Sequence, residues 1–227
     1  MQDSTTHNRT VSIAVAVVML VVGGLAGFGI TKAADNNKND QMVAAPTSAT
    51  KAADLRSDLV TLGLEHMTLT AQAVDATLDG SADATAYASA LYANGTDIGA
   101  AVGSVYGKDA ENTFNTVWKL HLDQFVAYAG ASAKGDNAAK QAALDTIDSQ
   151  YTKPLAQYLA KANPNLPEQA LEGALRDHVA MTAKMIDDHV NKDYAAEASE
   201  LNMANKHMEG IFSTLAGAIV KQYPSKF

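Results

Sequence analysis

The sequence predicts an all-α protein, a six-helix bundle of three αα-hairpin repeats preceded by a single N-terminal transmembrane helix. Three observations predict this fold. From residue 52 onward, apolar residues recur at steps of three and four, the period of a helix with one buried face. Turn-forming residues interrupt this pattern at regular intervals, and no segment alternates as a half-buried strand does. One uncharged, mostly apolar segment lies at residues 11–30.

The composition limits the classes of function. The chain has 227 residues, a formal net charge of −8 and no cysteine. No run of lysine and arginine forms the basic patch that phosphate contacts require, so no nucleic-acid partner is predicted. The lack of cysteine excludes disulfides, thiolate zinc sites, iron–sulfur clusters and cysteine nucleophiles.

After a tail at residues 1–10, residues 11–31 are predicted to form a transmembrane anchor. The 20 residues VSIAVAVVMLVVGGLAGFGI carry no charge and would span roughly 30 Å as a helix, the thickness of a bilayer core. A cleaved signal peptide is the alternative, although its apolar region is usually only about 7–15 residues long. An anchor ahead of one long domain predicts a single-pass protein of the cell membrane, with the domain on the extracytoplasmic side. Gly23 and Gly27 form a G-x-x-x-G motif that would allow a homodimer through the anchor, and chance is the alternative.

Residues 32–51 are polar or small and are predicted to be a flexible linker to the helical-bundle domain at residues 52–227. Predicted hairpins cover about residues 52–107, 110–164 and 167–224. Each begins with a helix that carries one apolar stripe, and the members of the three stripes are Leu55, Leu59, Leu62, His66, Leu69 and Ala73; Phe114, Trp118, His121, Phe125 and Tyr128; and Leu171, Leu175, His178, Thr182 and Met185. Turns follow at about Gly80, Gly135 and Asn191.

One histidine recurs at the same point of each stripe. His66, His121 and His178 are 55 and 57 residues apart, which predicts an internal repeat. Repeats that pack around a common axis bring equivalent positions together, so the three imidazoles are predicted to converge. Such a site would bind zinc, copper, iron or nickel through nitrogen. The alternative is a structural histidine that duplication copied into three core positions.

Further ligands are predicted near this site. His207 is a candidate fourth histidine, and Met203 and Met181 are candidate thioether ligands, with Met185 and Met208 nearby in the sequence. Thioethers favour Cu(I), so copper is the first expected metal, followed by zinc or iron. The alternative is that these methionines fill gaps in an alanine-rich core.

Three polar features complete the predicted site. Asp97 shares a helix face with Asn94 and is a candidate hard ligand or a hydrogen-bond acceptor for a histidine. Alternatively, it caps or kinks the helix at Gly95. Thr70 and Thr182 each lie four residues after a stripe histidine and are predicted to orient its ring. A further histidine, His189, lies near a predicted turn and is expected to be exposed.

Several short motifs resemble an uncharacterised bacterial helical-bundle family, common in Bacillus relatives and often given misleading enzyme names. The resemblance covers about residues 55–227, and its marks are His66 with Thr70, NGTDIG at 94–99, VYG at 105–107, His121-Leu122, ANP at 162–164, His178 with Thr182, and the ending VKQYPSKF. The resemblance implies a helical fold and brings no established activity. The chain departs from the family at Leu69, where members carry tryptophan, and at Tyr151 and Lys153, where they carry an Asn/Asp pair.

The sequence therefore predicts a membrane-anchored, extracytoplasmic helical bundle that binds a transition metal for storage, buffering or sensing. No catalytic residue is predicted, because the chain has no E-x-x-H or H-E-x-x-H motif and no glycine loop that cradles phosphate. Two other classes of function stay open. One is a metal-free interaction or scaffold module of the cell envelope, and the other is a binder of haem or a small molecule between the helices.

Overall fold

The structure of the protein is a computed structural model that describes residues 50–227. The predicted tail, the anchor at 11–31 and nearly all of the linker lie outside the described residues, so these assignments stay predictions. Among the helices of residues 50–227, none is both long enough and apolar enough to span a bilayer. The chain from Ala45 to Phe227 forms a compact unit by itself.

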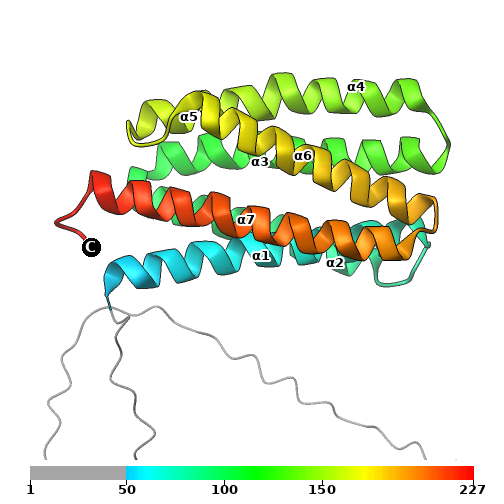
Figure 1. The fold of residues 1–227 in the computed structure, drawn as a ribbon, viewed down its shortest axis with the longest axis horizontal. Helices are drawn as coiled ribbons and strands as arrows, with labels where there is room; N and C mark the ends of the chain where they lie inside the picture. Colours follow the sequence, from blue (N-terminus) through cyan, green and yellow to red (C-terminus); the bar gives the residue numbers. More distant parts are fainter. Residues whose placement is uncertain (1–49) are drawn as a thin grey trace, which may run out of the picture. The chain divides into compact units, whose positions relative to one another are not determined.

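The described residues form an all-α domain with no strand. Its elements are α1 (Lys51–Leu78), α2 (Ala84–Tyr106), α3 (Lys108–Ala133), α4 (Asn137–Ile147), the π-helical segment η1 (Asp148–Thr152), α5 (Lys153–Ala162), α6 (Glu168–Val190) and α7 (Tyr194–Gln222). Because α4, η1 and α5 follow one another without a break, they make one long helix (Figure 1). The all-α fold of six helices is therefore confirmed for residues 51–222.

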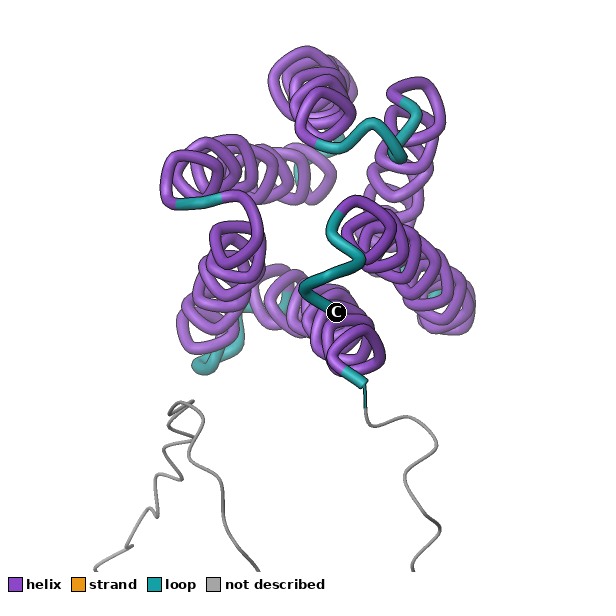
Figure 2. The backbone as a smooth tube through the Cα atoms, turned by 90° about the vertical axis from the view of Figure 1, so that its left-hand side faces the viewer, coloured by secondary structure: helices purple, strands orange, loops and turns teal. Residues whose placement is uncertain are grey.

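The six helices close into a ring, which is visible in the view along the bundle (Figure 2). Each helix packs against its neighbours in the chain, and the ring closes because the last helix, α7, packs on the first, α1. In addition, α1, α3 and α6 contact one another. These three alternate helices therefore line the middle of the bundle, and their inward faces share one core.

Local sequence explains where the helices begin and turn. The side chains of Thr50, Asp136 and Asp193 accept hydrogen bonds from backbone N–H groups at the starts of α1, α4 and α7. Gly80 and Gly135 take positive φ angles of 66° and 68° in the turns after α1 and α3. The turn after α6 has no glycine at the matching place, and Lys192 adopts a φ of 61° there.

A close approach between α1 and α7 depends on Gly63. A Cβ atom at this position would lie 2.4 Å from Cδ2 and 2.8 Å from Cε2 of the Phe212 ring, and Phe212 itself is buried. Gly210, within α7, has no atom within 4 Å of an added Cβ. An added methyl group therefore has room at Gly210, which is exposed, but not at Gly63, which is buried.

We expect Gly63→Ala to lower the free energy of unfolding and Gly210→Ala to raise it. Overpacking against Phe212 costs about 1–3 kcal/mol, which exceeds the gain of about 1 kcal/mol from the better helix propensity of alanine. Gly210→Ala keeps only the gain. Urea unfolding of both variants measures the difference, and a stabilised Gly63→Ala protein would show that α1 and α7 are not in close contact here.

Candidate metal centre

The structure brings the three repeated histidines together. His66 of α1, His121 of α3 and His178 of α6 point into the middle of the bundle and are 1%, 0% and 2% exposed. The ring centroid of His66 lies 5.7 Å from that of His121 and 5.8 Å from that of His178, and the last two centroids are 6.3 Å apart. One nitrogen of each ring lies within 4.8 Å of the other two. These residues, the histidine triad, could hold a metal ion.

Most of the buried nitrogens of the triad have no hydrogen-bond partner. These are Nδ1 of His66, both ring nitrogens of His121, and Nδ1 of His178. A buried polar atom without a partner costs a fold about 1–3 kcal/mol, and such atoms are rare in natural proteins. A bound ligand could satisfy these nitrogens.

Burial keeps the three imidazoles uncharged at neutral pH. It lowers the pKa of His66 to about 4, an effect that the nearby Asn94 side chain partly offsets. Burial and the neighbouring His66 and His207 lower the pKa of His178 to about 3. The pKa of His121 is also well below its usual value, because burial and then the other two triad members outweigh the backbone at Trp118, which raises it. Neutral imidazoles have a free lone pair, which is the form that binds metals.

Aromatic rings hold His121 in place where hydrogen bonds do not. Tyr151 stacks on His121 with ring centroids 4.2 Å apart and an angle of 20° between the rings. Trp118 meets the same imidazole edge-on at 4.6 Å, and its centroid lies 5.0 Å from that of His66. The hydroxyl of Tyr151 is buried and has no partner of its own. The rings are therefore positioned by packing, and their nitrogens are left free.

Tyr151 reaches the triad from the π-helical segment η1. Pro154 lies one turn later, within the long helix, where it has no N–H to donate and its ring crowds the preceding turn. We attribute the wider π-turn to this proline. Such segments frequently occur at functional sites. Sequence reasoning missed η1, although a proline in the middle of an otherwise helical segment was the available signal.

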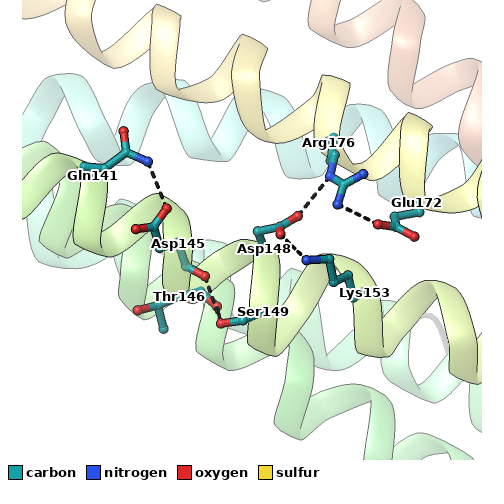
Figure 3. Close-up of polar contacts among 8 residues, drawn as sticks. All are labelled: Gln141, Asp145, Thr146, Asp148, Ser149, Lys153, Glu172 and Arg176. Carbon is teal, nitrogen blue, oxygen red and sulfur yellow. Dashed lines mark hydrogen bonds and ion pairs between the residues drawn. The ribbon is translucent and has the colours of Figure 1, made fainter.

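Polar contacts hold the outer side of η1 (Figure 3). Asp148 accepts from Arg176 of α6 at 2.9 Å and pairs with Lys153 at 2.7 Å. The Ser149 hydroxyl donates to the carbonyl of Asp145 at 2.8 Å. The contact with Arg176 fastens the π-turn to α6, and Tyr151 of the same segment is fully buried.

The other predicted ligands differ in burial and in their contacts. His207 donates from Nε2 to the carbonyl of Ala174 at 2.8 Å, and its ring does not join the three converging imidazoles. Met203 is 46% exposed, whereas Met181 is partly buried and packs on the apolar core. Asp97 is exposed on α2. Among the imidazole and carboxylate groups of residues 50–227, only the three triad histidines meet at this place.

The two threonines beside the triad bond to the backbone. Thr70 donates to the carbonyl of His66 at 2.7 Å, and Thr182 donates to that of His178 at 2.9 Å. Each hydroxyl has a single proton, so that proton does not reach an imidazole ring. Their predicted role in orienting the rings is therefore not supported by these hydrogen bonds.

The prediction that His189 is exposed was wrong, because three carboxylates surround it. Its ring is 6% exposed, with Nδ1 at 3.1 Å from both Asp75 Oδ1 and Glu197 Oε2, and Nε2 at 3.3 Å from Asp79 Oδ1. Burial lowers the pKa of His189, but Asp79, Asp75 and Glu197 outweigh it and raise the value. Burial and Glu197 raise the pKa of Asp75 to about 7. This acidic cluster connects the ends of α1, α6 and α7.

Comparison with known proteins gives no relative for this fold. No family model, curated protein or solved structure matches the chain. The resemblance to a bacterial helical-bundle family therefore stays a prediction. Function is inferred from the site alone.

Proposed function

We propose that the protein binds a transition-metal ion at the centre of its bundle through His66, His121 and His178. The observation that carries this proposal is the group of four unpartnered ring nitrogens in a site that is almost fully buried. The ligand nitrogens lie within 4.8 Å of one another, and an ion with bonds of about 2.0–2.1 Å would draw them to roughly 3.3 Å. Small shifts of the rings within their packing, together with side-chain rotation, would have to supply that movement.

Three imidazoles suit several metals, and copper is the first candidate. Copper binds nitrogen sites more tightly than zinc, iron or nickel in the usual order of divalent metals. The exposed side chain of Met203 weakens the case for a thioether ligand, so the preference rests on the imidazoles. Three protein ligands leave a fourth tetrahedral position open.

The N-terminal anchor would hold this metal site at the outer surface of the cell membrane. Residues 11–30 are long enough to span a bilayer, and the helices of residues 51–222 belong to one compact unit. Storage, buffering or sensing of the metal would follow from this arrangement. A haem site is disfavoured because the cavity beside the triad has a volume of about 60 Å³, well below the roughly 300 Å³ of typical small-molecule pockets.

Elemental analysis of the purified full-length protein tests the proposal. We expect close to one metal ion per chain after loading with copper, zinc or iron, and none when all three triad histidines are changed to leucine. His207→Gln is the matched control and should keep the full metal content, because His207 lies outside the triad. A folded wild-type protein that takes up no metal would favour the scaffold function. Metal retained by the triple variant would move the site to the acidic cluster.

A further inference from the structure

An apolar cavity leads from the surface of the bundle to the histidine triad. Its outer end lies among Thr77 of α1, Tyr92 of α2 and Val126 of α3, which is 60% exposed. Its inner end is formed by the three triad imidazoles, and its volume is about 60 Å³. Three separate stretches of chain therefore meet around one cavity that the triad side chains line at its inner end.

The lining of this cavity excludes charged molecules. No lysine, arginine, aspartate or glutamate is among its lining residues, and most of the wall is aliphatic or aromatic: Val74, Leu91, Leu122, Phe125 and Ala129. The inner hydroxyls, Thr70 and Thr182, already donate their protons to backbone carbonyls. An ion entering here would lose its water shell and meet no charged side chain in return, which costs several kcal/mol.

The size of the cavity restricts its occupant further. A volume of about 60 Å³ exceeds the roughly 10–15 Å³ that one water molecule needs, but it is far below that of a pocket for a metabolite. Cavities lined by apolar side chains bind gases such as xenon. The dimensions and lining together match a neutral molecule of two or three heavy atoms.

We propose that this cavity admits a neutral diatomic gas, of the class of dioxygen and carbon monoxide, to the open coordination position of the triad metal. The inference rests on the proposed metal site. The three imidazoles would hold the ion from the protein side, and the same three residues line the inner end of the cavity. The metal ion itself enters by another route, when the bundle opens or as it folds.

Two variants of α2 distinguish a blocked cavity from the general effect of adding a phenylalanine to this helix. Ala88 lines the outer part of the cavity and is partly buried, so Ala88→Phe places a ring in the path. Ala93 lies on the same helix, is exposed and does not line the cavity, so Ala93→Phe is the matched control. Neither residue belongs to the triad. Circular dichroism checks that both variants fold.

The first measurement uses xenon and the metal-free full-length protein. We expect saturable xenon binding by NMR in the wild type and in Ala93→Phe, and binding at least tenfold weaker in Ala88→Phe. This step needs no metal, so it tests the cavity independently of the proposed function. Absence of saturable xenon binding in the folded wild type would overturn the inference.

The second measurement uses carbon monoxide and protein loaded with Cu(I). We expect an infrared C≡O band from a copper carbonyl in all three proteins, forming at least tenfold more slowly in Ala88→Phe at equal copper content. Equal rates in the two variants would overturn gas entry through this cavity and leave the metal site standing. If the protein binds xenon but takes up no copper, zinc or iron, the metal site and the delivery of gas to it are both overturned. The gas-binding cavity would then stand by itself.

Discussion

His121→Leu is expected to make the metal-free protein more stable and to abolish its metal binding. Both ring nitrogens of His121 are buried without a partner, and each costs about 1–3 kcal/mol. Leucine removes both nitrogens, although it also loses the contacts with Tyr151 and Trp118, worth about 0.5–1.5 kcal/mol each. The net gain is about 2 kcal/mol, or about 4–8 °C in Tm for a domain of this size.

Thermal unfolding in the presence of a chelator measures this effect. His207→Leu is the matched control, because it makes the same chemical change at a histidine that donates a hydrogen bond to Ala174. That variant should lose about 0.5–1.5 kcal/mol. Excess metal should reverse the order of wild type and His121→Leu, since a ligand at 100 times its Kd stabilises by about 2.7 kcal/mol. If His121→Leu lowers the free energy of unfolding of the metal-free protein, the imidazole of His121 does not destabilise the fold.

Mild acid is expected to unfold the metal-free protein. An unfolded histidine has a pKa of about 6.5, whereas the fold lowers the pKa to about 4 for His66 and about 3 for His178. Below pH 6.5 the unfolded chain therefore binds protons that the folded chain does not bind. The free energy of unfolding thus decreases as the pH decreases. The contribution of these histidines to the free energy of unfolding is fully present above pH 6.5. It is lost as the pH falls from 6.5 toward their pKa values in the folded protein. The loss is about 2 kcal/mol at pH 5 for each of these two histidines. Burial lowers the pKa of His121 as well, so His121 contributes in the same direction.

The acidic cluster makes the fold more stable as the pH falls, the opposite of the triad. The effect of the triad is therefore measured as the difference between the wild type and the triple leucine variant. The pKa values of Asp75 and His189 are both raised in the fold, which favours the folded chain as the pH falls. These residues are present in both the wild type and the triple leucine variant of the triad, so their contribution cancels. Urea unfolding at pH 7 and pH 5 should show a much steeper loss in the wild type. Equal slopes would mean that the triad takes up protons in the folded state.

The triad therefore lowers the stability of the metal-free bundle in two ways, by unpartnered nitrogens and by sensitivity to acid. Natural sequences accept such violations of packing mainly where function requires them. A bound ion removes both penalties at once, because it satisfies the nitrogens and competes with protons. Stability of the loaded protein would then depend on metal concentration as well as on pH.

Sequence periodicity was sufficient for the fold class and for the central site residues. Steps of three and four residues predicted the helices, and the same steps placed His66, His121 and His178 on buried faces. Their shared register predicted that they converge, which the structure confirms. Such inferences succeed because the face of a helix is fixed by local spacing alone.

Contacts between distant segments decided the rest of the site. The π-turn that brings Tyr151 onto His121 depends on how one helix accommodates Pro154 within the bundle. His189 is buried because Asp75 and Asp79, more than 100 residues earlier, pack beside it, and His207 bonds to a neighbouring helix instead of joining the triad. Periodicity fixes which side of a helix is buried, but the rotation and axial shift of packed helices decide which buried side chains meet. Only the tertiary structure contains that information.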